Sequence, residues 1–143
     1  MTIEIPTMQD QLKDWLNQYY FQAFVTLTLK DDRIPNHDLE DKILNWVRKA
    51  QRADRIQLAY QGVINSAGRK HVHLLMVGKD RRGNTIKDTF YPLWFDNWNG
   101  LTDFQLVYYN EGIIGYIVDM NTPCQRFQLL TPYNTKLLRR SMI

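Results

Sequence analysis

The apolar and polar residues of the chain follow two periods. Apolar residues that alternate with polar ones are typical of strands, because successive side chains of a strand point to opposite faces. This alternation predicts strands over residues 21–30, 55–65, 70–78 and 103–109. Apolar residues three or four positions apart form one stripe on a helix, which predicts helices over 8–19, 38–51 and 111–120. Residues 85–98 are rich in aromatic side chains and are expected to form a helix or an irregular cap over the sheet.

The order of these elements favours an α+β fold. We expect a central antiparallel sheet of four to five strands with helices packed on it, arranged as in ferredoxin-like or RRM-like (RNA-recognition-motif) domains. The two middle strands should form an antiparallel hairpin across the Ser66–Arg69 turn. No repeat or linker divides the chain, so we expect one domain over residues 1–143, with its core over about 20–120 and a basic C-terminal extension over 121–143.

Composition narrows the class of protein. With 143 residues, 44% of them hydrophobic and 23% charged, the chain is expected to fold as a globular domain rather than to be disordered. The net charge of +3 permits nucleic-acid binding without requiring it. The single Cys124 excludes an internal disulfide and fits a reducing cytoplasm. No signal-peptide pattern and no apolar run near the roughly 18 residues of a membrane span is present, so we expect a soluble cytoplasmic protein without a membrane partner.

The histidine motif His71-Val72-His73 is the most informative stretch for chemistry. In a strand the two histidines emerge on one face, while Val72, Leu74 and Met76 point the other way into a core. Two imidazoles one strand-step apart can share a divalent ion. The alternative is an exposed strand face that carries two histidines without a metal.

Two further motifs stand in order around the histidines. The threonine motif Phe24-Val-Thr-Leu-Thr28 precedes them, and Tyr116 follows them with Asp119 three residues later. This order resembles the HUH endonucleases, and in particular the small Rep proteins that initiate rolling-circle replication. The resemblance covers roughly residues 20 to 120. The histidine motif matches fully and the threonine motif closely, whereas the third motif matches at the tyrosine only.

The resemblance implies a metal-dependent endonuclease that nicks and rejoins single-stranded DNA at a replication origin. Tyr116 would attack the phosphodiester and form a 5′-phosphotyrosine, with His71 and His73 holding Mg²⁺ or Mn²⁺. The family takes its third metal ligand, a Glu or Gln, from the strand that pairs with the histidine strand. Here that strand offers Gln61, our first choice because it lies nearer the turn, and Gln57 as the second.

Asp119 departs from the family pattern, which has a lysine near this position. An aspartate cannot supply positive charge, so its role is open between an extra metal ligand, a base for the phenol and a solvated helix residue. For Tyr116 itself, the alternative is a core aromatic flanked by Ile114 and Ile117. The remaining histidine, His37, lies at a predicted helix start and is expected to be a capping or surface residue.

Several cations should lie around the histidines and contact the DNA backbone, or else be solvated loop charges. They are Lys30, Arg69, Lys70 and Lys79, with Arg81 and Arg82 in the following loop. The basic tail 136–140 could pack on the domain, bind DNA or support a homodimer.

The resemblance implies an origin on a plasmid or virus genome as the DNA partner, with a host helicase or polymerase acting separately. Two other functions stay open. One is a transposase or relaxase of the same superfamily. The other is a non-catalytic module that binds single-stranded nucleic acid.

Overall fold

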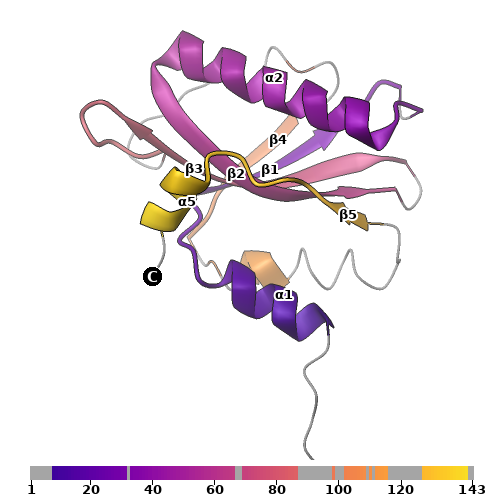
Figure 1. The fold of residues 1–143 in the computed structure, drawn as a ribbon, viewed down its shortest axis with the longest axis horizontal. Coiled ribbons are helices and arrows are strands. Elements are labelled where there is room, and N and C mark those ends of the chain that lie inside the picture. Colours follow the sequence, from indigo (N-terminus) through magenta and orange to yellow (C-terminus); the bar gives the residue numbers. More distant parts are fainter. Residues whose placement is uncertain are drawn as a thin grey trace, which may run out of the picture.

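The computed structural model has an α+β fold built on a five-stranded antiparallel sheet (Figure 1). The residues that it describes are 8–31, 33–66, 69–86, 98, 102–108, 110, 112–115 and 127–141. The expected α+β class and the central antiparallel sheet are therefore confirmed. No helix in these residues is long and apolar enough to cross a membrane.

The strands are arranged in the order β4-β1-β3-β2-β5. All neighbouring pairs are antiparallel, and the long β2–β3 pair forms the expected hairpin. In chain order the elements are α1 (Met8–Leu16), β1 (Ala23–Thr28), α2 (Asn36–Asp54), β2 (Ile56–Asn65), β3 (His71–Asp80), β4 (Thr102–Leu106), β5 (Phe127–Leu129) and α5 (Thr135–Arg140). Residues 110 and 112–115 are also helical.

The ends of α2 follow from local sequence. Pro35 occupies the N-cap position with extended backbone angles, which proline adopts readily, and Asp38 adds a negative charge to the first turn. At the other end Arg55 adopts the left-handed conformation, with φ at 53°, and its N–H donates to the carbonyl of Gln51. This closes the helix immediately before β2 begins.

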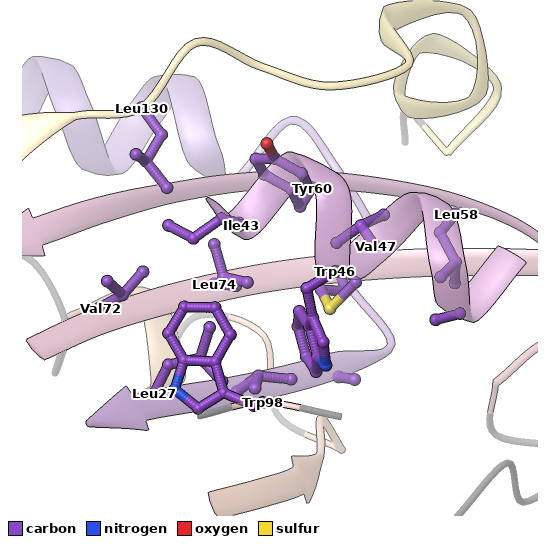
Figure 2. Close-up of a cluster of buried hydrophobic side chains, with 14 of the residues drawn as sticks. Leu27, Ile43, Trp46, Val47, Leu58, Tyr60, Val72, Leu74, Trp98 and Leu130 are labelled. Carbon is purple, nitrogen blue, oxygen red and sulfur yellow. The ribbon is translucent and has the colours of Figure 1, made fainter. Parts of the chain in front are cut away.

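The main apolar core lies between α2 and one face of the sheet. Figure 2 shows side chains of α2 meeting those that rise from the strands beneath it. Trp98 completes this core: its ring meets Trp46 edge-on at 5.6 Å, and its indole N–H donates to the carbonyl of Thr28. The other buried members include Val25, Leu27, Leu39, Ile43, Val47, Leu58, Val72, Leu74 and Met76.

The opposite face of the sheet carries a second, smaller core. Phe24, Leu75 and Val77 from the strands pack there with Leu16 of α1 and Ile114. Leu137 and Leu138 of α5 are buried in the same cluster. Helices therefore cover both faces, with α2 on one side and α1 on the other (Figure 1).

The segment 127–141 was not predicted as regular structure. It adds β5 to the edge of β2, and Leu130 and Tyr133 continue the backbone contacts to Gly62 and Tyr60. Asn134 then caps α5 by accepting from the Leu137 amide, while its side-chain amide donates to the carbonyl of Leu58. The basic tail packs on the domain, which was one of its three expected roles, since the leucines of α5 are buried.

Candidate metal and nucleic-acid site

A pocket of about 610 Å³ opens on the face of the sheet opposite α2. We call it the histidine pocket. Three strands form its floor, and the helical stretch before Tyr116 contributes one wall residue, Ile113. It is lined by Phe24, Thr26, Thr28, Arg69, His71, His73, Asp103, Gln105 and Ile113.

Strand register brings the threonine and histidine motifs together. β1 and β3 pair so that Thr26 faces His73 and Thr28 faces His71. On its other side Thr26 faces Asp103 of β4. Because directly paired residues project to the same face, these side chains form two adjacent rows across the sheet. The expected common face of the two histidines, opposite buried Val72, is confirmed.

The ring of His71 is oriented by a backbone carbonyl. Its Nδ1 lies 3.0 Å from the carbonyl oxygen of Arg69. A carbonyl oxygen only accepts hydrogen bonds, so Nδ1 carries the hydrogen and donates it. A neutral ring with the hydrogen on Nδ1 has its free lone pair on Nε2. Metal-ligating histidines adopt this tautomer when a neighbouring acceptor binds the Nδ1 hydrogen.

His73 is the buried member of the pair. Its side chain stacks on Phe24 with ring centroids 5.3 Å apart, and its Nδ1 lies 3.1 Å from the hydroxyl of Thr26. Burial, with a smaller contribution from His71, lowers the pKa of His73 from 6.5 to about 4. The ring is therefore neutral at physiological pH. Its Nε2 is buried and has no hydrogen-bond partner among the described residues.

Gln61 offers a second buried acceptor on the same face. It pairs with Leu75, which makes it a diagonal neighbour of His73 rather than its direct partner. Its amide nitrogen donates to the carbonyl of Leu130 at 3.1 Å, while its Oε1 is buried and has no partner in the described part of the chain. Gln57 is exposed and pairs with Lys79 toward the far end of the hairpin.

The hairpin register differs from the sequence expectation by a few residues. Asn65 pairs with His71 and Val63 with His73, so the residues directly opposite the histidines are not glutamines. The connection between the strands is confined to residues 66–70, and this short turn fixes which residues face each other. Asn65 is buried and was not considered as a site residue from the sequence.

The predicted cations separate into two groups. Arg69 lines the histidine pocket, and its guanidinium donates to the carbonyl of Leu29 at 2.6 Å. The ammonium of Lys70 donates to the carbonyl of Ile34 at 2.7 Å, and Lys30 is exposed nearby. Lys79 was expected beside the histidines but lies toward the other end of β3, where it lines a different pocket together with Arg81.

Tyr116 and Asp119 lie outside the described residues, as does residue 111 at the expected helix start. The residues that precede Tyr116 are placed: Ile114 is fully buried in the smaller core, and Ile113 lines the histidine pocket. The chain thus reaches the pocket just before Tyr116. His37 is on the surface, with its Nε2 3.1 Å from the carboxylate of Asp38, as expected.

Asp103 is a pocket residue that sequence reasoning did not single out. It is exposed on β4, and the amide of Gln105 donates to its carboxylate at 3.2 Å. Its alternation within the predicted strand 103–109 was visible in the sequence. The pairing of β4 with β1, which brings Asp103 to the pocket, could not be predicted from the sequence because the two strands are far apart in the chain.

The donor set fits a divalent ion. Two imidazoles and an amide oxygen are a mixed nitrogen and oxygen set. Among the described residues neither His73 Nε2 nor Gln61 Oε1 has a hydrogen-bond partner, and a cation would satisfy both atoms when the Nδ1 of His73 carries the ring hydrogen. No cluster of three or more His, Cys, Asp or Glu side chains with metal-binding geometry occurs within the described residues. The chain matches no protein-family model, no curated protein and no solved structure.

Proposed function

We propose that this protein is a metal-dependent, DNA-nicking endonuclease of the HUH superfamily, of the Rep type. One observation carries the proposal. The two motifs of the resemblance face each other in the sheet, Thr26 contacts His73, and the buried, neutral imidazole of His73 lies beside a second histidine with no described residue as a partner for its Nε2. A structural histidine in a core is normally satisfied at both ring nitrogens.

The strand arrangement supports the finer fold proposal. β1 and β2 are joined through α2 and lie on either side of β3, while β4 returns to the free edge of β1. A split β-α-β unit of this kind belongs to the ferredoxin-like plan, on which HUH and RRM-like domains are built. The sheet then presents His71 and His73 near its centre, on the face away from α2.

His71, His73 and Gln61 are the residues that would hold Mg²⁺ or Mn²⁺. When bound, such an ion neutralises charge on the scissile phosphate and orients it. The surrounding residues hold the ligand side chains in fixed orientations. The carbonyl of Arg69 fixes the ring of His71, and Thr26 and Phe24 fix that of His73.

Tyr116 is the proposed nucleophile. Its phenolic oxygen would form a bond to phosphorus while the bond from phosphorus to the 3′ oxygen breaks. The phenol proton is transferred to the leaving 3′ oxygen, and the 5′ phosphate stays on the tyrosine as an ester. Because the ester retains the energy of the phosphodiester, a 3′ hydroxyl can reverse the step and rejoin the strand.

Arg69 supplies positive charge that Asp119 cannot. A phenol has a pKa of about 10, so attack near neutral pH requires a nearby cation or a base. The guanidinium of Arg69 has five N–H donors, and its hydrogen bonds to the carbonyls of Leu29 and Lys30, within the described part of the chain, involve only one of its nitrogens. The remaining donors are available for a phosphate in the histidine pocket. Asp119 then serves as a base for the phenol or as a further metal ligand.

The proposed substrate is single-stranded DNA at a plasmid or viral origin, with strand separation supplied by another protein. The test is a denaturing gel with single-stranded oligonucleotides and Mn²⁺. The wild-type protein should form a covalent adduct, and Tyr116→Phe should not, because only the phenolic oxygen is removed. Tyr108→Phe is the matched control, since Tyr108 is 83% exposed and follows β4.

Peptide mapping should place the nucleotide mass on the peptide that contains Tyr116. An adduct that persists in Tyr116→Phe would refute this assignment. Retarded migration on a native gel without any covalent adduct would instead favour the non-catalytic binding module.

A further inference from the structure

A second pocket, of about 520 Å³, lies where four segments of the chain end or begin. These are the C-terminal end of α2, the start of β2, the end of β3 and the last turn of α5. We call it the basic pocket. It is lined by Gln51, Arg52, Arg55, Ile56, Gln57, Lys79, Asp80, Arg81 and Arg140.

Positive charge is concentrated in the basic pocket. Five cationic side chains and one carboxylate line it, which gives a local surplus of four positive charges. The whole chain carries only +3, so the remaining residues together are slightly negative. Like charges that share a concave surface raise its potential and attract anions from solution.

Salt bridges among the described residues do not account for this cluster of cations. None of the five cations forms a salt bridge with another residue in the described part of the chain. The carboxylate of Asp80 accepts hydrogen bonds from the amides of Arg82 and Asn84, which hold the turn after β3. Arg52, Arg55 and Arg140 lie at helix C-terminal ends, where the helix dipole favours cations. That effect does not explain Lys79 and Arg81.

The chemistry of the lining indicates the ligand. Four of the five cations are arginines, whose planar guanidinium matches phosphate oxygens in a bidentate manner. Gln57 adds an exposed, neutral donor beside them. The cations come from three separate segments, the C-terminal end of α2, the end of β3 with the following turn, and α5, and they surround a volume far larger than one phosphate group. This spread suits several consecutive phosphates rather than one small anion.

We propose that the basic pocket binds the phosphodiester backbone of a polynucleotide, at a distance from the histidine pocket. Lys79 and His73 lie on the same strand and the same face, six positions apart, which corresponds to roughly 20 Å. A nucleic acid held at both pockets would therefore extend along β3. Binding at the basic pocket requires neither a metal nor Tyr116.

The test compares two double variants that remove the same charge from the same two helices. Arg52→Gln with Arg140→Gln alters the basic pocket, whereas Lys49→Gln with Arg139→Gln alters exposed cations of α2 and α5 outside it. Binding of fluorescent single-stranded and duplex oligonucleotides is measured by anisotropy over a salt series. EDTA is present throughout and the His71→Ala background is included, so that failure of the nuclease proposal leaves this test unaffected.

The pocket double variant should bind at least about tenfold more weakly, and the slope of log K against log salt should fall by about 1.5, as for two lost phosphate contacts. The control should change affinity by less than about threefold. Arg52→Lys with Arg140→Lys should keep most of the salt slope. Preference for single-stranded or duplex DNA identifies the bound form and supports the proposal in either case.

Equal losses in the pocket variant and the control would overturn the proposal, because they would indicate diffuse charge. Unchanged binding in the pocket variant, or no polynucleotide binding by the wild-type protein, would overturn it as well. Circular dichroism checks that each variant is folded, which is expected because all four substituted side chains are exposed.

Discussion

At the scale of single residues, the burial of His73 couples the stability of the fold to pH. The pKa of its imidazole is lowered from 6.5 to about 4, chiefly by burial and further by His71. Between these two values the unfolded chain binds more protons at this position than the folded chain. The neutral ring therefore makes its full contribution to the free energy of unfolding above about pH 6.5. This contribution is lost progressively as the pH falls toward 4.

The wild-type protein should lose about 3 kcal/mol of unfolding free energy from this residue between pH 7 and pH 4. His73→Gln should lack this component, so its stability should fall less steeply with acidification. Denaturant unfolding at several pH values measures both slopes. His37→Gln is the control, because it removes a histidine on the surface rather than a buried one. Parallel slopes for wild type and His73→Gln would contradict the burial argument.

At the scale of elements, the alternation of apolar and polar residues and the helical spacing of apolar residues correctly predicted β1, α2, β2 and β3. The two faces of β1 and β3 were predicted correctly, since Val25 and Val72 are buried in the main core while Thr26 and His73 line the pocket on the other face. The helix predicted over 38–51 is found as α2, with bounds extended to Asn36–Asp54. These predictions rest on local periodicity, which the sequence displays directly.

Features that depend on long-range pairing could not be predicted in the same way. β5 has only three residues, too few to show a period. The positions of Asn65 and Asp103 beside the histidine and threonine motifs depend on hairpin register and on β4 pairing with β1. Lys79 was expected near the histidines because it is close in sequence, but an extended strand separates the two by its full rise per residue.

Gly62 illustrates how strand pairing constrains β2. A Cβ atom there would lie 2.7 Å from Cδ2 of Leu74 and would also collide with the backbone carbonyl oxygen of His73. Gly62→Ala should therefore destabilise the fold by about 1–3 kcal/mol, because the backbone of a central strand cannot move aside freely. Thermal or denaturant unfolding measures the change.

Gly115→Ala provides the comparison. Gly115 lies in the helical stretch 112–115, and no atom of the described residues lies within 4 Å of the position its Cβ would occupy. This substitution should be neutral or stabilise the protein by up to about 1 kcal/mol, because alanine favours helix more than glycine does. Similar losses for both variants would show that crowding at Gly62 is not the cause.

At the scale of the whole molecule, metal binding should raise the stability of the fold. A ligand present at about 100 times its dissociation constant stabilises the folded state by about 2.7 kcal/mol. Saturating Mn²⁺ should therefore raise the melting temperature by several degrees, and the double variant His71→Ala with His73→Ala should not respond. EDTA should reverse the shift in the wild-type protein.

Two glutamine variants locate the third ligand in the same melting assay. Gln61→Ala should weaken the Mn²⁺ response, whereas Gln57→Ala should preserve it, because Gln57 is exposed near the other end of the hairpin. A Mn²⁺ response that is weakened in Gln57→Ala and preserved in Gln61→Ala would assign the third ligand to Gln57 instead. A full Mn²⁺ response in the histidine double variant would remove the metal from the histidine pocket altogether.

The pairing of β2 with β3 also fixes the distance between the histidine pocket and the basic pocket. Its paired residues run without interruption from Asn65 and His71 to Ile56 and Asp80. Inserting one residue in each strand between His73 and Lys79 would move the side chains of one pocket to the opposite face of the sheet. Inserting two residues in each strand would keep both pockets on their present faces and add roughly 7 Å between them. The distance between the two pockets can therefore change only in steps of two residues, so a nucleic acid that reaches both would have its contact points offset in discrete increments.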